Sequence, residues 1–152
     1  LLVACWEDGD RHLPGDASGH LFAVNLESGD DLVKAVEVAT ALPTAREAIA
    51  RVLEDTARAH TDPTTPAGCL MLTEPRLAAQ REVVRQQLKD RPDQGVRDRE
   101  LPTTADTDRL ASFLMAVLRG MSGCARDGGS TEDLLGIADV AMAAIPAPSR
   151  EP

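Results

Sequence analysis

Aromatic side chains are nearly absent from this sequence. Its 152 residues include no Tyr, one Trp (Trp6) and two Phe (Phe22 and Phe113), although 43% of the residues are hydrophobic. Most of the hydrophobic residues are Ala, Leu and Val. Because β-strands favour aromatic and β-branched side chains, whereas Ala and Leu are strong helix formers, this composition predicts an all-α fold.

Basic residues are also few. The chain has 16 Lys and Arg against 25 Asp and Glu, which gives a net charge of −9. Duplex DNA is a polyanion, and a protein that binds it needs a basic face. The chain as a whole has no excess of positive charge, so its composition argues against independent DNA binding.

Cysteine and long hydrophobic runs are the other shortages. Cys5, Cys69 and Cys124 are odd in number, far apart and never in CxxC spacing, which argues against a disulfide framework and a zinc site. No apolar run approaches the roughly 20 residues of a membrane span. The opening Leu1–Trp6 is too short for a signal peptide and has no positive start. These features predict a cytoplasmic protein with no membrane contact.

Helix start signals are abundant, and they predict several helices in a row. Ser28 can cap a helix over residues 28–39, and Thr44 with Glu47 forms a capping box for a helix that reaches about His60. The buried side of that second helix is predicted to be Ala48, Ile49, Val52, Leu53, Thr56 and Ala57.

Proline punctuates the middle of the chain. Two prolines make residues 61–66 a loop. The apolar block at 68–72 fits either a buried strand or one helical turn, and the flanking helices favour the turn. Pro75 suits the first turn of a further helix, which Pro92 is expected to kink or end. Residues 95–100 are polar and ambiguous.

Residues 109–135 are the most informative stretch, because they predict two helices with more apolar surface than one small core needs. At 100° per residue, six large side chains of the first helix fall within an arc of about 140° that predicts a core face. These are Leu110, Phe113, Leu114, Val117, Leu118 and Met121. Gly128–Gly129 ends this helix, and Ser130 with Asp133 resembles a capping box for the last helix, which extends to about Ile145.

The opposite side of the first of these helices carries small residues at helical spacing. They are Ser112, Ala116, Gly120 and Gly123. Small side chains let another helix come close. A Gly inside a helix costs about 1 kcal/mol relative to Ala, so two of them indicate a steric purpose.

No arrangement of reactive side chains in the sequence indicates an enzyme. His60 and Cys69 could act as base and nucleophile, but no Gly-rich oxyanion turn or third orienting group accompanies them. Core packing is the favoured role for Cys69, because Cys is among the most buried residue types. Cys5, His12 and His20 are too widely spaced for a usual zinc site. We expect no catalytic residue, no metal and no cofactor.

Methionine and neighbouring apolar side chains could line a ligand cavity, because Met adapts to varied shapes. Plain core packing is the alternative, and both stay open at this point. The predicted pocket residues are Cys69, Met71, Leu72, Phe113, Met115 and Val117.

Three stretches in this order resemble the C-terminal regulatory domain of the tetracycline-repressor (TetR) family of transcription regulators. The loop and Gly-Cys-Leu block of residues 62–70 resembles the family's loop followed by Gly-Cys-Leu/Met. Residues 99–111, with Glu-Leu-Pro and then Arg-Leu-Ala, resemble the Gly-Glu-Leu … Leu-Ala start of its penultimate helix. Residues 118–128, with Arg-Gly-Met and then Ala-Arg-Asp-Gly, resemble the end of that helix. The resemblance covers about residues 28–146.

The resemblance implies a division of the chain and a set of partners. Family members bind DNA through an N-terminal helix-turn-helix, dimerise through their last two helices and release DNA when a small molecule binds. For this chain it implies a helical ligand-binding and dimerisation domain over 28–146 and a tail over 147–152. Residues 1–27 would be an irregular or degenerate remnant of the DNA-binding region. We therefore expect a homodimer, a small apolar or aromatic ligand, and DNA binding only if a helix-turn-helix is present upstream.

The dimer interface implied by the resemblance consists of residues from the last two predicted helices. They are Ser112, Ala116, Arg119, Gly120, Gly123, Leu134, Ile137, Val140, Ala141 and Ala144. The alternative function is a stand-alone dimerisation or interaction module that sequesters a full-length paralogue or binds a small apolar molecule.

Overall fold

The described part of the chain is a bundle of α-helices. The computed structural model describes residues 32–147, and no strand occurs within that range. A helix over residues 32–40 comes first. The elements that follow are α3 (Ala45–His60), η1 (Leu70–Leu72), η2 (Pro75–Leu77), α4 (Ala78–Arg97), α5 (Thr107–Arg126) and α6 (Thr131–Ala144). The predicted all-α fold is confirmed, while the predictions for residues 1–27, for the Ser28 cap and for most of the tail lie outside the described residues.

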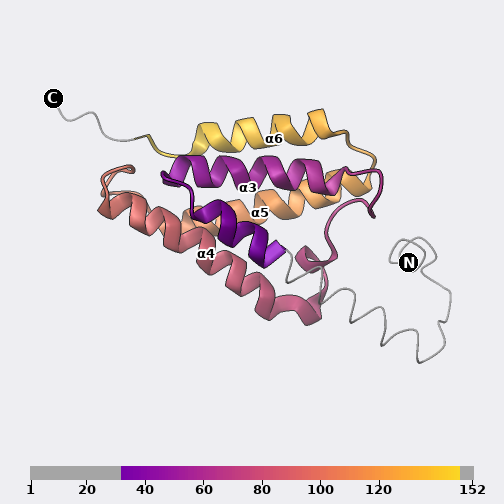
Figure 1. The fold of residues 1–152 in the computed structure, drawn as a ribbon, viewed down its shortest axis with the longest axis horizontal. Helices are drawn as coiled ribbons and strands as arrows, with labels where there is room; N and C mark the ends of the chain where they lie inside the picture. The colour runs from indigo at the N-terminus through magenta and orange to yellow at the C-terminus, as the bar shows by residue number, and fades with distance from the viewer. Residues whose placement is uncertain (1–31, 148–152) are drawn as a thin grey trace.

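Helix α5 lies at the centre of the bundle and contacts α3, α4 and α6. In Figure 1, α3 and α6 lie side by side, and α5 lies behind α3. Besides packing side by side, α3 and α6 are joined by hydrogen bonds. Arg46, in the first turn of α3, donates hydrogen bonds to the carbonyl oxygens of Met142 (3.0 Å) and Ile145 (3.3 Å) at the end of α6.

The start of α3 follows from its sequence. The backbone N–H of Glu47 donates to Thr44 Oγ1 at 3.2 Å, and the backbone N–H of Thr44 donates to Glu47 Oε2 at 3.1 Å. This is the predicted capping box, which satisfies two N–H groups that a helix start leaves without partners. All six residues predicted for the buried side of α3 are buried.

The apolar block at 68–72 forms a single 3₁₀ turn, η1, in agreement with the helical alternative. The turn is docked on α5 by Cys69, whose backbone N–H donates to the Oγ of the fully buried Ser122 at 2.8 Å. Gly68 has a φ of +77°, and a Cβ at this position would lie only 2.6 Å from the carbonyl oxygen of Ser122. The close approach of the two backbones therefore requires Gly.

Pro92 does not end α4, which continues to Arg97. The helix lacks the hydrogen bond that residue 92 would donate, and the proline ring is buried. Of the two predicted alternatives, a kink or an end at Pro92, the end was wrong, because tertiary packing holds the last turn in place.

Arg91, next to this proline, is the centre of that packing. Its side chain is 6% exposed, and its Nη2 donates to the carbonyl oxygen of Pro43 (2.7 Å) and to Glu100 Oε2 (3.3 Å). Glu100 Oε2 in turn accepts from the backbone N–H of Ala45 at 2.6 Å. The two partners of one ion pair, Arg91 and Glu100, thus link the end of α4 to the start of α3 through their hydrogen bonds to Pro43 and Ala45. The sequence analysis left residues 95–100 ambiguous and did not find this pair.

The buried arc of α5 differs from the predicted core face. The buried residues of α5 are Leu110, Ala111, Leu114, Met115, Leu118, Met121, Ser122 and Ala125. Phe113 is 39% exposed and Val117 is half-buried, so the prediction was wrong for Phe113. The arc is turned by roughly 60° at 100° per residue. Burial follows the neighbours of α5, which are η1, α3, α4 and α6, and even the small Ala111 and Ser122 are fully buried.

Candidate functional site

Small and apolar residues lie on the exposed sides of α5 and α6, and we call this set of residues the α5–α6 face. It consists of Ser112, Phe113, Ala116, Gly120 and Gly123 on α5, and of Gly136, Val140, Ala143 and Ala144 on α6. Phe113 is 39% exposed and Val140 is 74% exposed. Exposed hydrophobic side chains of this size are typical of surfaces that another molecule covers.

The glycines of the α5–α6 face have open space above them. A Cβ built on Gly120, Gly123 or Gly136 would meet nothing within 4 Å. No packing within the described chain therefore requires Gly at these positions, although each Gly lowers the stability of an isolated helix by about 1 kcal/mol relative to Ala.

Two residues of the predicted dimer interface do not lie on this face. Leu134 is 0% exposed and Ala141 is 3% exposed, because both point from α6 into the core of the same chain. Ile137 is half-buried at the edge of the face, and Arg119 is exposed beside it on α5. The assignment of Ser112, Ala116, Arg119, Gly120, Gly123, Ile137, Val140 and Ala144 to an interface stays a prediction.

The predicted ligand-pocket residues are spread between the core and the surface. Met71, Leu72 and Met115 belong to the buried core cluster, while Cys69 and Val117 are half-buried against it. Phe113 lies on the α5–α6 face. None of the six lines either of the two hollows described below.

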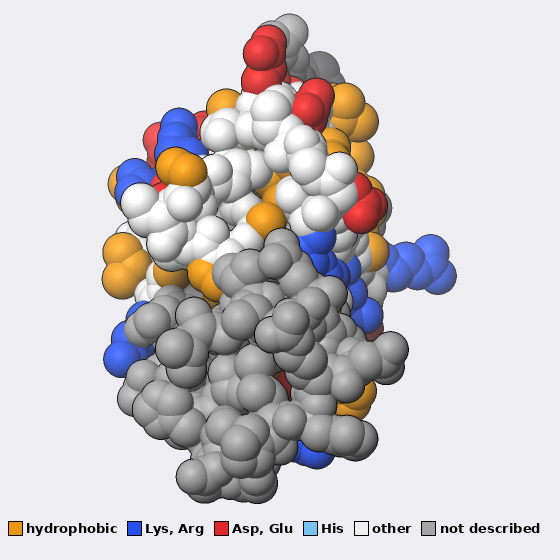
Figure 2. All heavy atoms as spheres, turned by 90° about the vertical axis from the view of Figure 1, so that its right-hand side faces the viewer, with side chains coloured by type: hydrophobic (Ala, Val, Ile, Leu, Met, Phe, Trp, Pro, Cys, Tyr) orange, Lys and Arg blue, Asp and Glu red, His pale blue; other side chains and the backbone are white. Residues whose placement is uncertain are grey.

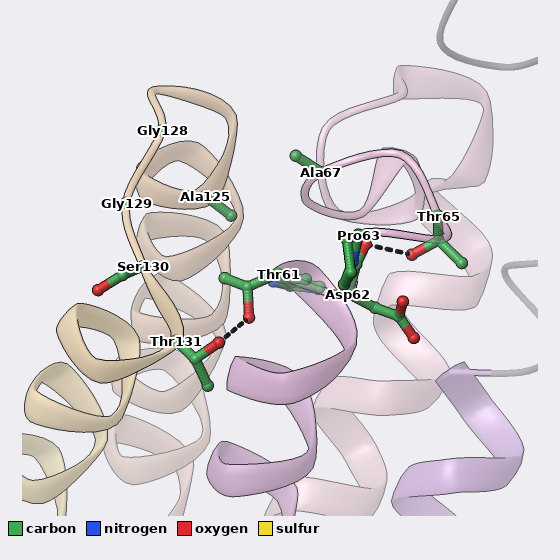
Figure 3. A pocket seen from close by; sticks show the side chains of 11 residues that line it. Thr61, Asp62, Pro63, Thr65, Ala67, Ala125, Gly128, Gly129, Ser130 and Thr131 are labelled. Atoms are coloured by element: carbon green, nitrogen blue, oxygen red, sulfur yellow. Dashed lines mark hydrogen bonds between the residues drawn. The ribbon is translucent and has the colours of Figure 1, made fainter.

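The larger hollow lies at the end of the bundle, between the loop after α3 and the turn that joins α5 to α6. It has a volume of about 380 Å³. Its lining residues are His60, Thr61, Asp62, Pro63, Thr65, Ala67, Ala125, Gly128, Gly129, Ser130 and Thr131. Figure 3 shows the loop residues on one side and Gly128 to Thr131 on the other, joined by the hydrogen bond between the hydroxyls of Thr61 and Thr131 at 2.7 Å. In Figure 2, which faces this end of the molecule, acidic side chains stand at the upper edge of a mostly uncharged surface.

His60 is the buried polar group of this hollow. It is 4% exposed, and its Nδ1 has no hydrogen-bond partner. Burial, and then the nearby positive charge of Arg126, lower the pKa of His60 to about 4. The imidazole is therefore neutral at physiological pH.

Cys69 is not an activated nucleophile. Burial raises the pKa of its thiol above the ordinary value, so the reactive thiolate is disfavoured. The thiol and His60 do not share the hollow, because Cys69 is absent from its lining. In residues 32–147, no group of three His, Cys, Asp or Glu side chains could hold a metal ion.

The second hollow, of about 330 Å³, lies between the helix over 32–40 and α4. Arg91 and Gln87 line it, and Arg91 Nη1 and Gln87 Oε1 are buried without partners. Charged residues of both signs surround it, among them Glu37, Asp90 and Arg97. The sequence analysis did not find this hollow, because a buried Arg on a polar helix resembles any exposed one.

The fold and the sequence both match known regulators. A cysteine-substituted form of the TetR family transcriptional regulator CifR, in complex with 26-bp operator DNA, superposes with a TM-score of 0.71 at 27% identity, covering 83% of this chain and 71% of that one. A candidate TetR transcriptional regulator from Rhodococcus sp. RHA1 superposes with a TM-score of 0.67 at 30% identity, covering 74% of this chain and 66% of that one. The chain is TetR-like in fold and in sequence.

A curated relative of this TetR-like chain is the HTH-type transcriptional repressor ComR of Escherichia coli K12, which is 32% identical over 102 residues. The match covers 57% of this chain and 47% of the repressor, so the chain spans about half the length of that relative. No family model matches the TetR-like chain. Among the helices of residues 32–147, none is long and apolar enough to cross a membrane.

Proposed function

We propose that this TetR-like chain is the ligand-sensing and dimerisation part of a transcription regulator, and that it dimerises through the α5–α6 face. The observation that carries the proposal is the open space over Gly120, Gly123 and Gly136. Three helical glycines lower the stability of α5 and α6, and a partner helix that packs closely over them would offset this loss.

The rest of the face supports the same assembly. Packing α5 and α6 of one subunit against the same helices of a second would form a four-helix interface around a two-fold axis. The exposed Phe113 and Val140 would then be covered. Only two side chains of the adjoining surface, Arg119 and Asp139, carry a charge away from the helix ends. A small charge density favours burial of this surface in a subunit interface.

DNA recognition is proposed only for a form of the protein that carries a helix-turn-helix. The CifR structure contains operator DNA, and ComR is named as a helix-turn-helix repressor. This chain has a net charge of −9, which opposes DNA binding by the regulatory part alone. A gel shift with duplex DNA at low salt should therefore show no tight complex with this chain. Tight binding would contradict this assignment.

The dimer is tested by a pair of matched substitutions. Ala116 on α5 and Ala79 on α4 are both exposed helical alanines, but only Ala116 lies on the α5–α6 face. We expect the unmodified chain and Ala79→Trp to sediment as dimers at micromolar concentration and Ala116→Trp to sediment as a monomer. The proposal would be refuted if the unmodified chain were a monomer, or if Ala116→Trp remained a dimer.

A further inference from the structure

We propose that Arg119 on α5 pairs with Asp139 on α6 of the partner subunit, and that the two equivalent salt bridges select a second copy of this chain as the partner. The inference rests on the proposed function, because it needs the dimer. It adds which helix meets which across the interface and which other chains the α5–α6 face rejects.

Arg119 and Asp139 are exposed charges without partners in their own chain. Neither side chain forms an ion pair or a hydrogen bond within residues 32–147. The sequence explains this, because an intrahelical partner must lie three or four residues away. Every residue at that spacing from Arg119 or Asp139 is uncharged.

Other charged residues near the start of α5 do have partners. Arg109 Nε lies 3.1 Å from Asp106 Oδ2, and Arg85 Nη1, on α4, lies 3.0 Å from Asp108 Oδ1. One positive and one negative charge, on different helices, are therefore left over beside the face.

Both leftover charges border the α5–α6 face. At 100° per residue, Arg119 lies about 20° from Ser112 around α5, and Asp139 lies about 40° from Ala143 around α6. A surface with one unpaired charge of each sign is complementary to a second copy of itself, because two-fold symmetry makes every contact between two different residues occur twice.

The charges also indicate how the helices of the two subunits stack. If each helix packs on its own mate, like charges face each other across the axis, whereas packing α5 on α6 of the partner subunit brings opposite charges together. Arg119 lies about two turns before the end of α5 at Arg126, and Asp139 about two turns after the start of α6 at Thr131. A two-fold axis that runs along the helices keeps these heights, so Arg119 comes level with Asp139 of the partner subunit.

The main effect of these pairs is on the choice of partner. A salt bridge at the edge of an interface adds little affinity, whereas like charges brought together there oppose association. A related chain with the same sign of charge at both positions would meet this chain with one repulsive pair. The face therefore favours a second copy of this chain over a paralogue with different charges.

Charge reversal tests the pairs, because two variants that dimerise poorly alone should bind each other. In a dimer of Arg119→Glu both pairs would be acidic, and in a dimer of Asp139→Lys both would be basic. We expect each variant to dimerise at least roughly tenfold more weakly than the unmodified chain in sedimentation at micromolar concentration. In an equimolar mixture both pairs are opposite in charge, so native mass spectrometry should detect the heterodimer as the main dimer.

Two further variants complete the test. The double variant Arg119→Glu/Asp139→Lys exchanges the charges and should dimerise like the unmodified chain. Arg51→Glu is the matched control, because it changes the net charge as much as Arg119→Glu does but lies on the exposed side of α3. It should leave the dimer intact.

The outcomes separate this inference from the proposed function. If the unmodified chain is a dimer but the single variants dimerise as tightly, or their mixture forms no heterodimer, the charge pairs are refuted and the dimer stands. A monomeric double variant would also refute them. If the unmodified chain itself is a monomer, the proposed function fails together with the pairs.

Discussion

At the scale of single residues, His60 couples the fold to pH. The folded protein keeps this imidazole neutral down to about pH 4, whereas the unfolded chain protonates it below about pH 6.5. As pH falls between these values, the unfolded state binds the proton first, so the free energy of unfolding decreases.

We predict that titration of His60 does not change the free energy of unfolding above pH 6.5 and lowers it as pH falls from 6.5 to about 4. The loss should be at most about 3 kcal/mol, since one pKa unit corresponds to about 1.4 kcal/mol. Urea unfolding of the unmodified chain and of His60→Gln at several pH values measures it. The carboxylates titrate in both proteins, so the difference between the two curves isolates His60. Parallel curves would contradict the prediction.

Gly68 and Gly128 form a second matched pair. Both have a positive φ, of +77° and +92°, but only at Gly68 would a Cβ collide with backbone, 2.6 Å from the Ser122 oxygen. We expect Gly128→Ala to lower the free energy of unfolding by about 1 kcal/mol from backbone strain alone. Gly68→Ala should lower it by about 3 kcal/mol, because η1 must also move away from α5. Chemical denaturation measures the loss of unfolding free energy in both variants. Equal losses would show that the backbones of η1 and α5 can accommodate a Cβ at Gly68.

At the scale of helices, the Arg91–Glu100 pair positions the end of α4 against the start of α3. Arg91 is 6% exposed and Glu100 is 21% exposed. Removing one partner of a buried pair leaves the other charge without compensation. Here it would also remove the donor to the carbonyl oxygens of Leu42 and Pro43.

We predict that Arg91→Met lowers the free energy of unfolding by about 2–4 kcal/mol. Arg51→Met is the control, because Arg51 pairs with Asp55 on the exposed side of α3 at 59% and 40% exposure. An exposed pair of this kind contributes little to stability, because water screens both charges. Equal effects of the two substitutions in thermal or urea unfolding would mean that the Arg91 network does not hold the helices together.

Helix positions were predictable where the signal is local, and helix faces were not. Thr44–Glu47 and Ser130–Asp133 are capping boxes that satisfy their own backbone groups, so their sequence alone specifies two helix starts. Phe113 has no such local determinant. Its exposure depends on which side of α5 meets α3, α4, α6 and η1, and hydrophobicity alone placed it in the core.

At the scale of the whole molecule, the glycines of the α5–α6 face have opposite effects on the stability of one subunit and on dimer formation. With nothing within 4 Å of a Cβ at Gly120, Ala at this position should stabilise the isolated subunit by about 0.5–1 kcal/mol. The same methyl group would separate two subunits whose helices approach closely there.

We therefore predict opposite effects of Gly120→Ala at the two ends of a dilution series. The melting temperature of the unmodified chain should rise with protein concentration, because a dimer is stabilised by mass action. In Gly120→Ala the melting temperature should be higher than normal in dilute solution and should rise less on concentration. A uniform upward shift at all concentrations would show that no partner helix approaches Gly120.

The candidate sites differ in how far the sequence could reveal them. Small residues at helical spacing on α5 indicated the face directly, because spacing along one helix is a property of one segment. The hollow near His60 could not be predicted, since its walls come from residues 60–67 and 125–131. These segments meet only through contacts such as the one between Thr61 and Thr131.

The tie from Arg46 to the end of α6 has a consequence for synthesis on the ribosome. Its acceptors, Met142 and Ile145, follow Arg46 by 96 and 99 residues, so α3 is made long before the helix that covers it. Contacts of such long separation form late and slow the folding of a chain. The part of α3 that α6 covers therefore stays uncovered until α6 has been synthesised, although α4 and α5 can pack against the rest of α3 earlier.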